Sequence, residues 1–174
     1  TPHGGAPMLS VVELSALPQR FITLAEVLLQ ELQRAHGPKL VSVAIFGSVA
    51  RGVASPDSDL DVLIVADGLP KGRMSRVEQF LPVEEAVAAR VAAARALEIS
   101  PVFKTPEEAE RGSPLFWDMT LDLLVLYDRD GFLIRLLDRV RRRLEALKAR
   151  RVFRGNAWYW ILKEDYRPGE VFEI

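Results

Sequence analysis

The chain has 174 residues, enough for one ordinary domain or for one domain with an appended element. Hydrophobic residues make up 49% and charged residues 27%, as in a folded globular protein, and the lack of cysteine excludes disulfides, thiolate zinc sites and cysteine nucleophiles. A net charge of −1 argues against a whole-protein grip on nucleic acid, and no apolar run approaches the ~20 residues of a membrane span. We therefore expect a cytoplasmic protein. Its excess of arginine over lysine fits either a thermophile or a GC-rich genome.

The first third of the chain reads as a helix followed by two strands. Apolar residues at helical spacing predict an amphipathic helix over about 18–35, which Gly37 and the proline after it end. A short β-branched segment predicts a strand over 40–46, broken by Gly47. A polar loop then leads into a second apolar strand over 61–65.

The rest of the chain continues the alternation. Pro101 lies inside one predicted strand and indicates the edge of a sheet. Thr105, followed by proline and by Glu108, has the form of a capping box at the start of a helix. The remaining predicted elements are a helix over 75–96, a strand over 97–103, a strand over 123–127 and a helix over 133–149.

This order of elements predicts an α/β (α+β) fold, in which a mixed, mostly four-stranded sheet has helices packed against it. We expect a flexible tail over 1–9 and a main domain over 10–130. A C-terminal helix and an aromatic extension over 131–174 are expected to pack on that core. Trp158, Tyr159 and Trp160 in the extension either pin down the chain end or stack on a base, and pinning is favoured.

Two aspartates, Asp59 and Asp61, stand two residues apart at the entry of the second strand, so their carboxylates project from one face. Carboxylates this close repel each other unless a cation neutralises them. Mg²⁺ suits such a pair because it takes one or two protein carboxylates and completes its shell with phosphate oxygens and water. A two-ion magnesium site is the functional interpretation, with Mn²⁺ as the other candidate ion. A solvated acidic turn is the structural alternative.

The end of the first strand carries a complementary signal. Gly47 lets a phosphate approach the backbone, and Ser48 offers both an amide and a hydroxyl at the start of a helix. A plain glycine turn is the competing interpretation of these two residues alone.

Together, Gly47-Ser48, Arg51-Gly52 and Ser58-Asp59-x-Asp61 resemble the signature of the DNA polymerase β-like nucleotidyltransferase superfamily. The closest similarity is to its small prokaryotic members, the minimal nucleotidyltransferases. The strong resemblance covers about residues 40–66, and the order of elements is compatible to about residue 127. It implies a polymerase β-like core and a nucleoside triphosphate substrate, with ATP as the first candidate.

The resemblance also implies a division of roles. Asp59 and Asp61 would be catalytic metal ligands. The nucleotide-binding set would be Gly47 and Ser48 on the triphosphate, Arg51 on a phosphate or bracing the loop, and Ser58 orienting the loop.

The family usually adds a third acid on a later strand. Counted back from the helix that Thr105 caps, this position falls on Ser100. Glu98 lies two residues earlier on the same face of the strand, and we take it as the catalytic candidate. Asp122 is a weaker candidate.

These residues predict Mg²⁺-dependent transfer of a nucleoside monophosphate from an NTP to a hydroxyl acceptor, with release of pyrophosphate. The resemblance slightly favours a protein acceptor of the HEPN type. One alternative is a catalytically weak nucleotide-binding or partner-neutralising protein. Another is an RNA-binding module that uses the stretch 135–154, which contains nine basic and two acidic residues. A solvated helix face explains that stretch better.

Overall fold

The computed structural model describes residues 12–55, 57–95 and 97–174, so the predicted tail over 1–9 lies outside the described residues. One four-stranded sheet has the order β3-β2-β1-β4. β1 runs antiparallel to both of its neighbours, whereas β2 and β3 are parallel, and this mixed sheet confirms the predicted fold class. Its strands are β1 (Leu40–Phe46), β2 (Leu60–Ala66), β3 (Ile99–Lys104) and β4 (Leu124–Asp128).

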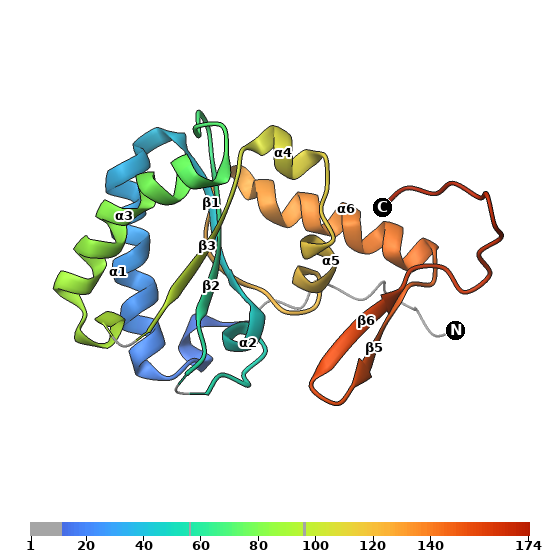
Figure 1. Ribbon diagram of the computed structural model, residues 1–174, viewed down its shortest axis with the longest axis horizontal. Helices are drawn as coiled ribbons and strands as arrows, with labels where there is room; N and C mark the ends of the chain where they lie inside the picture. Colours follow the sequence, from blue (N-terminus) through green and yellow to red (C-terminus); the bar gives the residue numbers. More distant parts are fainter. Residues whose placement is uncertain (1–11, 56, 96) are drawn as a thin grey trace.

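Helices cover both faces of this sheet. In Figure 1, α1 and α3 lie on one side of it and α4, α5 and α6 on the other. Within the described ranges, no helix has the length and apolar character that crossing a membrane requires. The α-helices are α1 (Gln19–His36), α2 (Gly47–Ala50), α3 (Arg73–Arg90), α4 (Pro106–Glu110), α5 (Leu115–Met119) and α6 (Phe132–Ala146). Short 3₁₀ helices are η1 (Leu14–Ala16), η2 (Gly37–Lys39), η3 (Ala92–Arg95) and η4 (Arg129–Gly131).

The two central strands are apolar along nearly their whole length because both of their faces are buried. Val43 and Ile45 point into the core that α1 and α3 cover. Ala44 and Leu63 point into the second core, beneath α5 and α6. The ends of β1 and β2 are therefore held by a sheet that is packed on both sides.

Most predicted elements are confirmed, with shifted ends. Pro101 lies in an edge strand as predicted, and Thr105 forms the predicted capping box with Glu108. The helix predicted to run to residue 96 ends at Arg90, because the buried Val91 is extended and a 3₁₀ turn follows it.

The C-terminal extension folds into an unpredicted hairpin of β5 (Arg150–Arg154) and β6 (Ala157–Ile161). Arg154 pairs with Ala157 across a two-residue turn, in which Gly155 has φ +60°, a conformation that glycine adopts without strain. The hairpin projects from the main body beside α5 (Figure 1).

Candidate active site

A cavity of about 410 Å³ opens where β1 ends and β2 begins. It is lined on one side by residues of β1, α2 and β2, and on the other by α5, the segment after it and the hairpin. The lining residues are Phe46, Gly47, Ser48, Arg51, Asp59, Asp61, Leu115, Asp118, Asp122 and Trp158. Five of the seven predicted site residues, all except Ser58 and Glu98, thus line one pocket.

Gly47 leaves β1 with φ +72°, in the left-handed region that favours glycine. A Cβ at this position would overlap Oδ2 of Asp61 and lie 3.1 Å from its Cγ. The pairing of Phe46 with Asp61 in the antiparallel register explains this proximity. Glycine is therefore required here both by the backbone and by the space that the Asp61 carboxylate occupies.

Asp59 and Asp61 enter the cavity from the start of β2, as the spacing predicted. Asp59 is exposed, whereas Asp61 is half-buried. Burial and the negative charge of Asp59 raise the pKa of Asp61, and the positive charge of Arg51 partly opposes this rise. The negative charge of Asp61 is thus only partly compensated by its described surroundings.

The carboxylate oxygens of this pair fit a divalent cation such as Mg²⁺, which prefers oxygen ligands. Its charge would neutralise the repulsion between Asp59 and Asp61. Within the described part of the chain, no group of three or more acidic or histidine side chains is arranged to hold a metal ion. Among the described residues, Asp59 and Asp61 would therefore supply the protein carboxylates, and phosphate and water the remaining ligands.

Ser48 and Arg51 lie on the cavity, Ser48 in the first turn of α2 and Arg51 at its end. Arg51 forms no ion pair with any described carboxylate; its guanidinium carbon instead lies 4.4 Å from the centre of the Trp158 ring. Ser58 is not among the described lining residues. Its hydroxyl accepts a hydrogen bond of 2.8 Å from the backbone N–H of Ser55, which suits the loop-orienting role.

Ser100, the position where a third acid is expected from the sequence, is the direct neighbour of Asp61 in the parallel register of β2 and β3. Glu98 is exposed just before β3, and its carbonyl accepts a hydrogen bond of 2.8 Å from the backbone N–H of Leu60. Its side chain is not among the described residues that line the cavity. Glu98 stays a prediction, without geometric support from the cavity.

Asp118, Asp122 and Trp158 form the far wall of the cavity. From the sequence, Asp122 is only a weaker candidate for the third acid, and Trp158 is expected to pin down the chain end rather than to stack on a base. Asp122 forms an ion pair of 2.8 Å with Arg151. The signal that could have revealed this wall is Gly155-Asn156 between two β-prone segments, which is typical of a hairpin.

The basic stretch over 135–154 is largely neutralised within the fold. Ion pairs to nearby carboxylates involve Arg139, Arg141, Arg142, Arg150 and Arg151. The buried leucines of α6 occupy the opposite face. This arrangement supports the interpretation as a solvated helix face.

Comparison with known proteins gives a consistent assignment. The family model of the nucleotidyltransferase domain matches residues 25–111. A protein of Methanocaldococcus jannaschii described as a "putative protein adenylyltransferase" is 31% identical over 122 residues, which cover 69% of this chain and 80% of that protein.

Two solved structures show weaker similarity. A chain of a toxin–antitoxin structure with AMP-PNP has 17% identity and a TM-score of 0.45, covering 71% of this chain and 92% of that chain. A chain from the complex of tri-AMPylated Shewanella oneidensis HEPN toxin with MNT antitoxin has 16% identity and a TM-score of 0.42, covering 74% and 92%. The family model and the Methanocaldococcus relative carry the assignment: this chain belongs to the nucleotidyltransferase domain family, within the polymerase β-like superfamily, and is a nucleotidyltransferase.

Proposed function

We propose that this enzyme transfers the adenylyl group of Mg·ATP to a hydroxyl group of a protein side chain. The observation that carries the proposal is the placement of the closely spaced pair Asp59 and Asp61 against the Gly47-Ser48 turn in one cavity. The name of the Methanocaldococcus relative supports ATP as donor and a protein as acceptor. A HEPN-type protein is the first acceptor to test.

In the reaction, the acceptor oxygen attacks the α-phosphorus in line with the leaving group. A new P–O bond forms, the bond to the β-phosphate bridge breaks, pyrophosphate leaves, and the hydroxyl proton is released to solvent. Mg²⁺ supplies charge neutralisation and orientation of the phosphates when it is bound. Asp59 and Asp61 would bind this ion through their carboxylates. The backbone N–H groups of Gly47 and Ser48 and the Ser48 hydroxyl would donate hydrogen bonds to phosphate oxygens, and Arg51 would add positive charge.

The test measures Mg·ATP binding by calorimetry and pyrophosphate release with the acceptor encoded next to this gene. We expect Asp59→Ala and Asp61→Ala each to abolish release and to weaken Mg·ATP binding by at least about tenfold, since metal-mediated contacts contribute several kcal/mol. Asp57→Ala is the matched control, because this aspartate lies in the same loop and is not among the described residues of the cavity. Mg·ATP binding that survives both substitutions would disprove the proposed site.

Ser100 favours a second possibility, a nucleotide-binding protein with weak catalysis. Because Ser100 sits beside Asp61, Ser100→Asp would restore a third carboxylate, and Ser100→Asn is its uncharged control. If the missing acid limits the enzyme, Ser100→Asp should raise pyrophosphate release by about tenfold or more, within the range of general acid–base contributions. If instead Glu98 serves as the acid, Glu98→Gln should lower release in the otherwise unchanged protein.

A further inference from the structure

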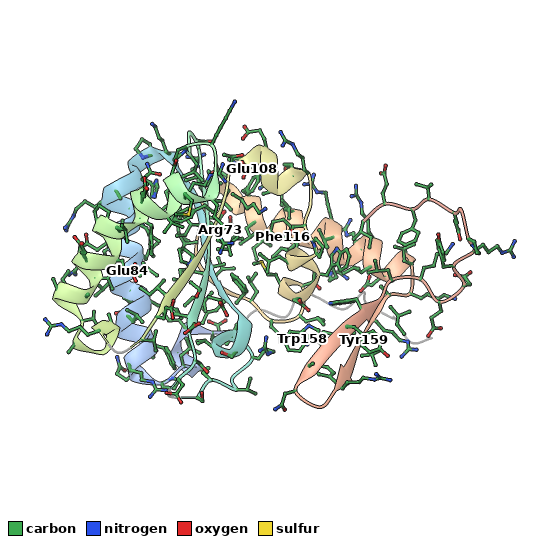
Figure 2. The ribbon with its side chains drawn as sticks, in the orientation of Figure 1. Arg73, Glu84, Glu108, Phe116, Trp158 and Tyr159 are labelled. Carbon is green, nitrogen blue, oxygen red and sulfur yellow. The ribbon has the colours of Figure 1, made fainter. Side chains whose placement is uncertain are left out.

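The hairpin turns one face toward the cavity, and the alternation along its strands determines which side chains that face carries. Trp158 and Trp160 are two residues apart on β6 and share a face, whereas Tyr159 lies on the other face and is exposed. The register places Arg151 opposite Trp160 and Phe153 opposite Trp158. Figure 2 shows Trp158 between the hairpin and α5.

This face is attached to α5 by polar contacts. Oδ1 of Asp118 accepts hydrogen bonds from both indole N–H groups, at 2.9 Å from Trp158 and 3.0 Å from Trp160. Arg151 adds an ion pair to Asp122 at 2.8 Å and a longer one to Asp118 at 3.6 Å. Asp118 is therefore a common anchor for both tryptophans.

The two tryptophans differ in what their rings touch. The ring of Trp160 packs edge-on against Trp117, with 6.5 Å between ring centres. The ring of Trp158 lies in the cavity and carries the guanidinium of Arg51, at 4.4 Å from the ring centre. Trp160 thus stabilises the attachment of the hairpin, whereas Trp158 connects the hairpin to a residue of the nucleotide site.

The partner of Arg51 determines whether the positive charge of its guanidinium group stays available to a ligand. A carboxylate partner would neutralise the guanidinium, whereas an aromatic face holds it by its quadrupole and leaves its N–H groups free at the edge. A long arginine side chain also has considerable rotamer freedom, which a ring beneath it restricts. The Trp158 ring therefore keeps Arg51 in the cavity and available to an anion.

We propose that Trp158 is a positioning residue that holds Arg51 at the phosphate side of the cavity, so that the C-terminal hairpin is part of the nucleotide site. The inference rests on the proposed function, in which Arg51 contacts phosphate. The family model ends at residue 111 and so does not reach the hairpin.

The experiment measures the Kd of Mg·ATP by calorimetry for the wild type and for Trp158→Ala, Trp158→Phe and Trp160→Ala, each checked by thermal melting. We expect Trp158→Ala to weaken binding about three- to tenfold, as loss of a cation–π contact predicts. Trp158→Phe keeps an aromatic face but loses the indole N–H and part of the ring area, so it should weaken binding less than Trp158→Ala does. Trp160→Ala is the matched control, because it removes the same kind of bond to Asp118 without touching the cavity.

A double-mutant cycle with Arg51→Ala separates positioning from direct contact. If Trp158 acts through Arg51, the double variant Arg51→Ala/Trp158→Ala should bind no more weakly than Arg51→Ala, within about twofold. Additive losses would mean that Trp158 touches the nucleotide itself, and equal losses in Trp160→Ala and Trp158→Ala would mean a purely structural role; either result overturns the inference. Wild-type protein that does not bind Mg·ATP overturns the proposed function as well, whereas binding that needs Asp59 but ignores Trp158 overturns the inference alone.

Discussion

The two walls of the cavity are held in different ways. The first wall, made of Gly47, Ser48, Asp59 and Asp61, grows out of β1 and β2, whose backbones are hydrogen-bonded to each other and packed on both faces. The second wall has two parts: Asp118 and Asp122 are carried by α5 and the segment after it, and α5 is fixed in the core by its buried Phe116 and Met119. Trp158 belongs to a hairpin that pairs only with itself among the described strands and is attached to Asp118 and Asp122 by side-chain hydrogen bonds and an ion pair.

Because of this difference, the hairpin can move relative to the rest of the site without global unfolding of the protein. Displacing the first wall requires disturbing the sheet, which opens only near the free energy of global unfolding. The hairpin part of the second wall can detach by losing the Trp117–Trp160 ring contact and a few polar contacts, each contributing on the order of 1–3 kcal/mol where a charge is involved. The first wall is therefore expected to be rigid, and the second to be adjustable.

The largest expected effect comes from Gly47→Ala in the first wall. The new Cβ would push the Asp61 carboxylate out of its position in the proposed metal site, so we expect Mg·ATP binding and pyrophosphate release to fall by about 100-fold or more, as misplacements of about 1 Å can cause. Calorimetry and a pyrophosphate assay measure both losses.

Gly52→Ala is the control for this substitution. Gly52 has φ +73°, almost the same as Gly47 at φ +72°, but nothing lies within 4 Å of a Cβ at this position. Both variants therefore share the backbone strain, and only Gly47→Ala has the clash. Equal losses of nucleotide binding in the two variants would show that strain, and not the space beside Asp61, explains the effect.

The two walls also differ in how far the sequence predicts them. The continuous apolar run over 40–46 and the Asp-x-Asp entry to the next strand predict β1, β2 and the placement of Asp59 and Asp61, because local periodicity and strand alternation decide these features. The short helix α5 and the position of the hairpin depend on contacts between residues about 40 apart, such as Trp158 with Asp118, and local patterns do not encode such contacts.

A weaker effect is expected from detaching the second wall with Asp118→Ala. This substitution removes the acceptor of both indole N–H groups, so amide exchange of residues 150–161 should accelerate by about tenfold or more while that of β1 and β2 is unchanged. Hydrogen exchange followed by mass spectrometry measures this difference.

Asp138→Ala controls for the loss of an aspartate elsewhere. Asp138 forms its ion pairs with Arg141 and Arg142 of its own helix α6, so the exchange of 150–161 should not change. If Asp118→Ala accelerated exchange throughout the sheet, the two walls would be one cooperative unit and the comparison would fail.

Glu108→Gln tests the converse case, a polar contact that stabilises the sheet side without shaping the cavity. Glu108 accepts hydrogen bonds of 2.6 and 2.8 Å from Arg76, which lower the pKa of Glu108 to about 2 and join α3 to α4 (Figure 2 labels Glu108). Because the folded pKa is depressed, the stabilisation is fully present above the unfolded value of 4.5 and is lost as the pH falls toward about 2.

We therefore expect Glu108→Gln to lower the free energy of unfolding at pH 7 by about 1–2 kcal/mol, a value reduced for the partial exposure of the pair. Denaturant titrations at several pH values should show this difference shrinking below pH 4.5. The Kd of Mg·ATP should stay at the wild-type value. A weakened affinity would mean that the sheet edge communicates with the cavity.

The smallest expected effect is a change in Tm that has opposite signs for carboxylates in the two walls. The pKa of Asp61 is raised by burial and by Asp59, so the folded protein binds its proton more tightly than the unfolded chain does. Ionised Asp61 therefore destabilises the protein without ligand, and stability rises as the pH falls toward the folded pKa. Asp61→Asn should raise the Tm of the protein without ligand by about 1–3 °C near pH 7, with the gain fading at acidic pH, although it destroys the proposed metal site.

Asp122→Asn should have the opposite effect, because its carboxylate is paired with the largely buried Arg151 and the substitution leaves that arginine short of a partner. Thermal melts of both variants without ligand measure the two signs. We interpret a carboxylate that lowers the stability of the ligand-free protein as part of a cation-binding site. A carboxylate that raises this stability is interpreted as part of the attachment of the hairpin. If Asp61→Asn lowered the Tm as Asp122→Asn does, the first wall would lack the uncompensated charge on which the proposed metal site depends.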